Sequence, residues 1–374
     1  MTPEEMEKRI VRYGDLIPCK TAFIDAHTPG SDQKENFTII GGGVSESPDQ
    51  HVHIAVPHGF NIGAAGQPPK CRNSLHNHRT AEVFFVLSGR WRFFWGERGD
   101  AGEVILQEGD IINIPTNMFR GFENIGTDYG MIMAILGGDD AGGGVIWAPH
   151  VIEDAKDHGL ILGENGKLYD TKTGERLPDG VAPMAVLTEA ELKQVNVPTP
   201  MEVVGGYVRR YLDMVALAHS GAVKVIGEKG LIRDRPGFEI DLITRHCATD
   251  QQHAHDRSSV LMPVKGHWRI SWEGDDDDYG ERANERRTVS PPIIGRKRGG
   301  AANSSASLDS HTTQVGIHTA SRKRAATPTV MKRRSELVDM GGYASGDDED
   351  MSSCDPVFRY STGPRMSIRS VPWA

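Results

Sequence analysis

The chain has 374 residues, 38% of them hydrophobic, which is ample for a buried core and fits two domains, or one large domain with extra segments. Asp and Glu number 51 against 42 Lys and Arg, so the formal charge is −9. This acidity argues against a protein that wraps nucleic acid or lies on an anionic membrane. We therefore expect neither nucleic acid nor a membrane among its partners.

Cysteine usage and hydropathy predict the compartment. The four cysteines are scattered without a C-x-x-C pair, which is typical of a reducing compartment. No run of 18 apolar residues occurs, and the N-terminus lacks the apolar stretch of a signal peptide. These features predict a soluble, cytoplasmic protein. The 43 glycines predict many turns and favour a β-rich fold.

Residues 1–50 are predicted to be an N-terminal extension with one short helix. Thr2 and Glu5 have the spacing of a capping box, and Pro3 fits the first helical position, so a helix is expected over residues 3–13. From residue 51 to residue 147 the pattern changes. Short β-branched and aromatic runs alternate with turn signals every eight to twelve residues. This spacing predicts a β-sandwich or barrel.

The remainder divides into three predicted parts. Residues 148–232 form a connector with some helix, one over 151–158 and another opened by a capping box at Thr188 and Glu191. Strand-like runs resume in residues 233–292. Residues 293–374 are rich in Ser, Thr, Arg, Lys and Gly, too polar to offset the entropy of ordering, so a disordered tail is expected. A shifted reading frame or a retained intervening sequence would give the same biased composition.

Three short segments occur twice along the chain. The second copies lie about 177 residues after the first, and the pairs are 59–62 with 237–240, the H-x-H of 76–78 with that of 253–255, and the G-x-W-R-x-x-W of 89–95 with that of 266–272. One H-x-H is weak evidence, but the same order at one offset is hard to produce by chance. The chain is therefore predicted to contain two copies of one β-module.

The first copy contains a candidate metal site. Residues i and i+2 of a strand point to one face, so His76 and His78 can direct both imidazoles into one cavity, with Glu82 nearby. Two imidazoles and one carboxylate, with other coordination positions open, suit the oxygen chemistry of non-haem Fe(II).

These residues resemble the motifs of the cupin family. The first cupin motif, G(x)5HxH(x)3–4E(x)6G, fits from His76 to Gly89, except that Lys70 stands at the initial glycine. The second motif, G(x)5PxG(x)2H(x)3N, fits at Gly109, Pro115 and Asn124. Two copies in one chain are similar to bicupins such as the gentisate- and quercetin-type dioxygenases.

The resemblance implies an all-β fold: two tandem double-stranded β-helix (jelly-roll) modules, the second partial, joined by a partly helical connector. It implies a divalent metal on His76, His78 and Glu82, with Fe(II) favoured and Mn(II) second. The implied function is a dioxygenase-like oxidoreductase for a small anionic aromatic or hydroxy/keto acid. The alternatives are a cupin isomerase or decarboxylase, and a metal-poor cupin that binds a small molecule without turnover. A homodimer is expected by resemblance.

Two positions of the second motif depart from the family. Asn117 replaces its second glycine, and Arg120 replaces the metal-binding His. A guanidinium does not coordinate a cation. Arg120 is predicted to be a catalytic residue that anchors a substrate carboxylate, a task that suits its bidentate geometry. In a second alternative a fourth ligand comes from elsewhere (His51, His53 or His58), and in a third Arg120 pairs with Glu82 and no metal binds.

The second copy departs further. Ser259 stands at the position of Glu82, Arg286 at that of the motif glycine and Lys297 at that of Arg120. We predict that this module binds no metal and that His253 and His255 have structural roles.

Overall fold

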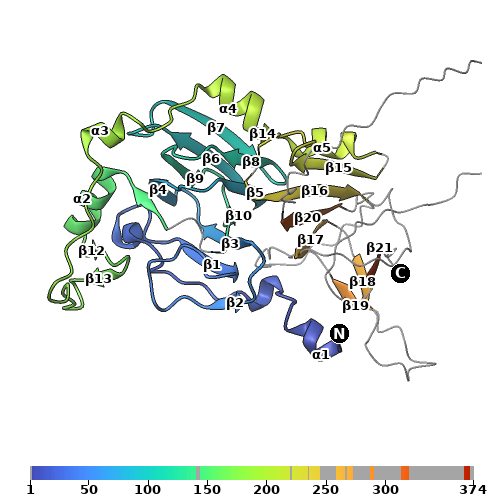
Figure 1. Cartoon of the computed structure of the whole chain (residues 1–374), viewed down its shortest axis with the longest axis horizontal. Coiled ribbons are helices and arrows are strands. Elements are labelled where there is room, and N and C mark those ends of the chain that lie inside the picture. Colours follow the sequence, from blue (N-terminus) through green and yellow to red (C-terminus); the bar gives the residue numbers. More distant parts are fainter. Residues whose placement is uncertain are drawn as a thin grey trace, which may run out of the picture.

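The structure is a computed structural model. It describes residues 2–139, 144–219, 221–234, 236–244, 258–265, 268–272, 287–289, 313–319 and 366–370. The predictions for His253, His255, Arg286 and Lys297, and for the tail apart from the last two segments, lie outside these residues. The described elements are mostly strands, and the predicted all-β class with a partly helical connector is confirmed (Figure 1).

Two sheets packed face to face form the first module. One has the order β14-β8-β5-β10-β3-β1-β2 and the other β11-β4-β9-β6-β7. The bounds are β1 (Glu35–Ile40), β2 (Val52–Ile54), β3 (Phe60–Gln67), β4 (Arg72–Asn77), β5 (Glu82–Ser88), β6 (Arg90–Trp95), β7 (Gly102–Gln107), β8 (Ile111–Ile114), β9 (Arg120–Asn124), β10 (Gly130–Gly137), β11 (Ile146–Trp147) and β14 (Val208–Arg209).

The core of this module lies between the two sheets. On β6, Trp91, Phe93 and Trp95 are buried, whereas the residues between them are half-buried. They pack against residues of the facing sheet such as Phe84 and Ile132. This period of two is what a strand with one core-facing side requires.

The N-terminal segment is part of this module, although the sequence predicted that the module begins at residue 51. Strand β1 pairs antiparallel with β3, so residues before 51 complete the sheet. The helix α1 (Pro3–Glu7) has the predicted capping box but is shorter than expected. It ends at Glu7 because, among Glu4 to Glu7, only Met6 is buried, and so short a helix has little packing to extend it. Two 3-10 turns follow, η1 (Tyr13–Asp15) and η2 (Ile24–His27).

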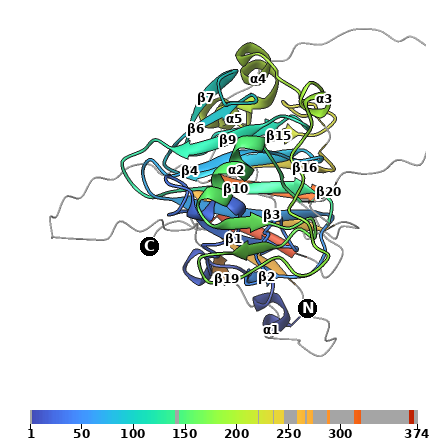
Figure 2. The ribbon, with the colours of Figure 1, turned by 90° about the vertical axis from the view of Figure 1, so that its left-hand side faces the viewer.

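The connector is partly helical, as predicted. It contains α2 (Pro149–Asp157), β12 (Leu160–Leu162), β13 (Leu168–Asp170), α3 (Glu189–Leu192), α4 (Pro200–Tyr207) and α5 (Tyr211–Leu217). The capping box of Thr188 and Glu191 is present. A further capping box, Thr199 with Glu202, opens α4 and was missed. Figure 2 shows α2 against the first module. Within the described part of the chain, no helix has the length and apolar character needed to cross a membrane.

The second copy repeats the strand order of the first. Its main sheet is β15-β16-β20-β17, from β15 (Ala222–Ile226), β16 (Phe238–Thr244), β17 (Ser259–Lys265) and β20 (Thr313–Thr319). In the first module, β1-β3-β10-β5 has the same order, and β10 lies between β3 and β5 as β20 lies between β16 and β17. A smaller sheet contains β19 (Arg287–Val289), β18 (Trp268–Trp272) and β21 (Met366–Ser370). Strand β20 lies within the segment predicted to be tail.

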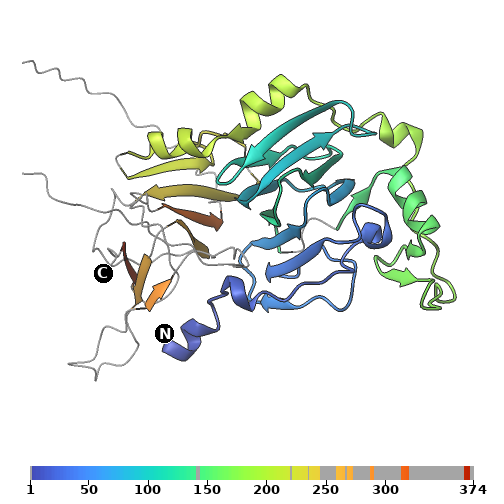
Figure 3. The same cartoon turned by 180° about the vertical axis from the view of Figure 1, so that it is seen from behind.

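The two modules meet through matching residues. Phe60 of β3 and Phe238 of β16, which belong to the repeated segments, have ring centroids 5.9 Å apart in one hydrophobic cluster. Each module thus contributes the same patch, as in the contact of a symmetric dimer. The approach is close: a Cβ on Gly137 would lie 2.1 Å from the carbonyl oxygen of Pro236. Figure 3 shows, from behind, the main sheet of the second module beside the sheets of the first.

Candidate metal centre

The three predicted metal ligands come together at the end of the first module. His76 lies on β4, His78 directly follows that strand, and Glu82 begins β5. All three are buried, with 4%, 2% and 4% of their surfaces exposed. One donor atom from each lies within 4.8 Å of the others. The predicted convergence is therefore present in the fold.

Backbone carbonyls fix how the two imidazoles face. The Nδ1 of His76 lies 2.7 Å from the Ser74 carbonyl oxygen, and the Nδ1 of His78 lies 2.8 Å from that of Gly144. A carbonyl only accepts, so each Nδ1 carries the proton and each Nε2 presents a lone pair. Histidine ligands of metals are held in this way.

The donor atoms lie farther apart than they would around a bound ion. The Nε2 of His78 is 3.8 Å from Oε1 of Glu82. Two donors each about 2.1 Å from one ion at a right angle would be about 3.0 Å apart. Side-chain adjustments of less than about 1 Å would close this difference. In donor type and direction, these residues fit a divalent cation.

Burial keeps both imidazoles uncharged. Desolvation, with the nearby Arg120 charge second, lowers the pKa of His76 well below its ordinary value. The same two causes lower the pKa of His78 to about 4, although Glu82 acts in the opposite direction. A protonated imidazole cannot coordinate, so both rings are ready to accept a cation at neutral pH.

Arg120 is buried beside this group. It begins β9 opposite His76, and its Nη1 donates a hydrogen bond of 2.8 Å to the His76 carbonyl oxygen. Its Nη2 forms an ion pair with Oε2 of Glu82. Only 1% of the residue is exposed, and it is not among the residues that line the adjoining cavity. The structure therefore has the Arg120–Glu82 pair of the third alternative, while Oε1 of Glu82 faces His78.

The second alternative, a fourth histidine ligand, is not supported. His53 contacts backbone groups of Ile17, Thr38 and Asp15. His58 contacts the Val56 carbonyl oxygen, and His51 packs edge-on against His53. Among the described residues, His76, His78 and Glu82 form the one group of three or more His, Cys, Asp or Glu side chains close enough to share an ion.

A cavity of about 70 Å³ adjoins the three side chains. Most of its wall is apolar or aromatic, including Phe84, Phe122 and Trp147. No Lys or Arg is among the lining residues that the structure describes. The N-terminal segment supplies part of the wall, such as Cys19 and Phe23.

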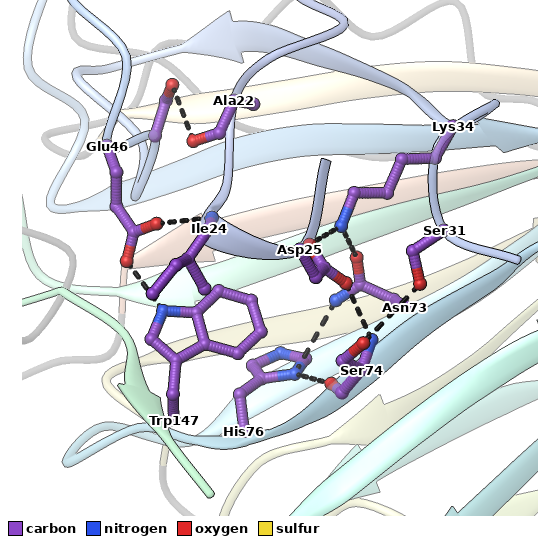
Figure 4. Close-up of polar contacts among 11 residues, drawn as sticks. Ala22, Ile24, Asp25, Ser31, Lys34, Glu46, Asn73, Ser74, His76 and Trp147 are labelled. Atoms are coloured by element: carbon purple, nitrogen blue, oxygen red, sulfur yellow. Dashed lines mark hydrogen bonds and ion pairs between the residues drawn. The ribbon is translucent and has the colours of Figure 1, made fainter. Parts of the chain in front are cut away.

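The N-terminal segment also places charged groups behind the site, and the sequence analysis missed them. Asp25 and Lys34 form a buried ion pair, and Asp25 accepts a hydrogen bond from the Ser74 backbone (Figure 4). Glu46 accepts a 2.6 Å hydrogen bond from the Trp147 indole, whose ring lies beside His76. Burial raises the pKa of Glu46 to about 8. The Asp25–Ser74 and Glu46–Trp147 contacts join residues 49 and 101 positions apart, so no local spacing marks them.

Comparison with known proteins supports the class of fold that this site belongs to. Residues 66–136 match the Cupin domain family, and the predicted resemblance is confirmed for this part of the chain. The match contains His76, His78, Glu82 and Arg120 together. No curated protein matches the sequence.

Solved structures of low identity also align with the chain. A variant of Bacillus subtilis oxalate decarboxylase aligns over 83% of this chain and 76% of that one, at 13% identity and a TM-score of 0.45. Lactobacillus farciminis oxalate decarboxylase in a formate complex aligns over 83% of this chain and 85% of that one, at 11% identity and a TM-score of 0.43. A structure from a study of the Mn(II) centres of the Bacillus subtilis enzyme aligns over 83% of this chain and 76% of that one, at 12% identity and a TM-score of 0.44. Likeness at these levels carries no information on substrate.

Proposed function

We propose that the first module is a metal-dependent oxidoreductase of the dioxygenase type that acts on a small oxygen-rich molecule. The observation that carries this proposal is the geometry of His76, His78 and Glu82. One imidazole nitrogen of each histidine and one carboxylate oxygen converge, and both Nδ1 atoms face backbone carbonyls. Two imidazoles with one carboxylate suit Fe(II) first, and Mn(II) is the second choice.

The chain's own residues orient and shield the site. When bound, the ion would supply a Lewis acid and a one-electron redox centre with free positions for small oxygen ligands. The backbone carbonyls of Ser74 and Gly144 keep the imidazoles turned toward it. Phe84, Phe122 and Trp147 line the space beside it and limit the access of water. Arg120 holds one oxygen of Glu82 and leaves the other free.

The cavity favours the smaller of the two expected substrate types. Its volume of about 70 Å³ is roughly half of the ~150 Å³ cavity that accepts benzene. A hydroxy or keto acid of a few carbons therefore fits better than an aromatic acid. The lining offers such an acid no Lys or Arg among the described residues, so its anionic group would depend on the bound ion. The expected role of Arg120 as a direct substrate anchor stays a prediction, and its pairing with Glu82 speaks against it.

Metal content and oxygen consumption test this function. Purified protein should carry Fe or Mn near one equivalent per chain, and His76→Ala should lose it. Oxygen uptake should then appear with a panel of two- to four-carbon hydroxy and keto acids and disappear in the same variant. Turnover without oxygen uptake would instead indicate a cupin decarboxylase or isomerase.

One observation favours a second candidate, a cupin that binds a small molecule without turnover. The Arg120 guanidinium already neutralises Glu82, which leaves less negative charge for a cation. If the protein takes up no Fe(II) or Mn(II) under anaerobic reconstitution, the binding function replaces the catalytic one.

A further inference from the structure

We propose that Asp25 and Lys34 are positioning residues of the metal centre, which hold the Ser74 backbone so that His76 keeps its Nε2 lone pair directed at the ion. This inference rests on the proposed function, because it concerns the same site. It assigns a role to the N-terminal segment, which lies outside the matched cupin residues 66–136.

The pair is completely enclosed. Asp25 is 0% exposed and Lys34 is 1% exposed, and their side chains form an ion pair with each other. Asp25 lies on the short turn η2, and Lys34 directly precedes β1. A buried ion pair is costly to desolvate and contributes less to stability than apolar residues of the same size often do. We therefore infer that the pair beside His76 has a role besides stability.

An irregularity in β4 makes Ser74 available to the pair. Asn73 lies opposite Phe122 and His76 opposite Arg120, so three steps on β4 match two on β9. This is a β-bulge, which interrupts the ladder and redirects side chains. Within it, the Ser74 N–H donates to Oδ2 of Asp25 at 3.0 Å, and the Ser74 carbonyl accepts from Nδ1 of His76 at 2.7 Å.

The second arm runs from Lys34 through Asn73. The Lys34 ammonium donates a 3.0 Å hydrogen bond to Oδ1 of Asn73, which turns the amide nitrogen toward His76 (Figure 4). That nitrogen lies 3.5 Å from Nδ1 of His76. An amide NH₂ cannot accept a proton, so the Ser74 carbonyl remains the acceptor for the Nδ1 proton. The Ser74 arm favours one tautomer, with the proton on Nδ1 and the lone pair on Nε2, while the Lys34 arm fixes the orientation of Asn73 beside the ring.

Two double variants that differ in one side chain separate positioning from stability. Asp25→Leu with Lys34→Met replaces the pair by apolar residues of similar size and leaves the Ser74 N–H without its acceptor. Asp25→Asn with Lys34→Met also removes both charges but keeps an amide oxygen for that N–H. Apolar replacement of a buried pair is often neutral for stability, so folded protein is expected from both.

The control is an ion pair with a similar set of contacts, in which the carboxylate is buried and the arginine side chain is 41% exposed. Asp110 is 1% exposed, forms an ion pair with Arg210 and accepts a 2.9 Å hydrogen bond from the Tyr211 backbone. It does not line the cavity. Asp110→Leu with Arg210→Met therefore removes the same kinds of contact away from His76.

Two measurements are made on the full chain. Mn(II) titration should show affinity at least tenfold weaker in the Leu/Met variant, the usual scale for a lost outer partner of a ligand, and within threefold of wild type in the Asn/Met variant and the control. Nitrogen-15 NMR of the metal-free protein, assigned with His76→Ala, should show the Nδ1–H tautomer in wild type and a mixture in the Leu/Met variant.

The outcomes separate this inference from the proposed function. Wild-type protein that binds no Mn(II) or Fe(II) would overturn the proposed function. An Nε2–H tautomer of His76 in metal-free wild type would overturn the inference, even if the variants failed to fold. A Leu/Met variant with unchanged tautomer and unchanged Mn(II) affinity would overturn it as well.

Discussion

The two modules share one order of strands, β1-β3-β10-β5 in the first and β15-β16-β20-β17 in the second. Strand β5 begins with Glu82, and the corresponding strand β17 begins with Ser259. The contact residues of the two modules also match, since Phe60 and Phe238 pack on each other from corresponding strands. The residue at the position of the candidate metal-binding carboxylate differs, because the second copy has only a hydroxyl there. The fold of this module therefore does not depend on the carboxylate.

A second difference lies in what precedes each sheet. Before β1, the N-terminal segment brings buried polar groups, Asp25, Lys34 and Glu46, to the back of the His76 site. Before the corresponding strand β15, the helix α5 packs on β15 and β16. The surroundings of the candidate site in the first module thus include this N-terminal covering segment as well as the barrel.

The largest effect is expected when the first copy is given the residue of the second. Glu82→Ser removes one of three donors and leaves Arg120 as an unpaired buried charge. We expect Mn(II) affinity to fall at least 100-fold, and the free energy of unfolding to fall by about 3–5 kcal/mol, the scale for breaking a buried pair. Metal titration and urea unfolding measure the two effects.

The reverse change is the control for that experiment. Ser259→Glu supplies the second copy with a carboxylate but is expected to leave the metal content at one equivalent per chain or below. A second equivalent of metal in Ser259→Glu would show that the two copies differ by this residue alone. Unchanged metal binding in Glu82→Ser would refute Glu82 as a ligand.

A smaller effect is expected from Arg120, which departs from the cupin pattern within the first copy. Removing the guanidinium removes a like charge from beside a divalent cation, so Arg120→Gln should bind Mn(II) about tenfold more tightly. Arg120→His should bind still more tightly, because it adds an imidazole. Without metal, both variants should lose about 3 kcal/mol of unfolding free energy, since Glu82 loses its partner.

Metal should restore more stability to these variants than to wild type, because the gain grows with affinity. Thermal unfolding with and without Mn(II) measures this difference. If Arg120→Gln binds Mn(II) more weakly than wild type, then Arg120 supports the metal rather than competing with it.

The sequence predicted those parts of the site that local spacing encodes. His76 and His78 are two positions apart on one strand and Glu82 follows closely, so their convergence could be inferred without a structure. The ion pair of Arg120 with Glu82 was one of three open alternatives, because spacing cannot tell toward which of two neighbours a long side chain turns. Asp25 and Lys34 were missed because they reach Ser74 across 49 and Asn73 across 39 positions.

Two residues that depart from the motif have a backbone conformation that glycine adopts easily. Lys70 and Asn117 replace motif glycines, and they are the two non-glycine residues of the described chain with positive φ, at 66° and 57°. The turns therefore keep the left-handed conformation that glycine accepts freely, at a cost of about 1–2 kcal/mol for other residues. Asn tolerates it better than most, and Asn117 also donates to the Gln194 carbonyl oxygen.

The smallest effect concerns Glu46, which belongs to the covering segment of the first module. Glu46 has a pKa raised to about 8 by burial, against an ordinary value of 4.5. Its protonated form therefore favours the folded state: the contribution is complete below pH 4.5 and is lost as the pH rises through 8. In Glu46→Gln, which stays neutral and still accepts from the Trp147 indole, this loss should be absent.

Urea unfolding at pH 6 and pH 9 measures the difference. We expect wild type to lose about 2–3 kcal/mol more than Glu46→Gln between these two values, because pH 6 lies about two pH units below the raised pKa and each pH unit contributes about 1.4 kcal/mol. Glu103→Gln serves as the control, because Glu103 lies on the exposed edge of the same module and faces Arg92. An equal pH dependence in wild type and Glu46→Gln would mean that Glu46 is ionised in the folded protein. The Trp147 and Ile24 donors would then suffice to hold a carboxylate charge behind His76, and the covering segment would contribute negative potential to the site.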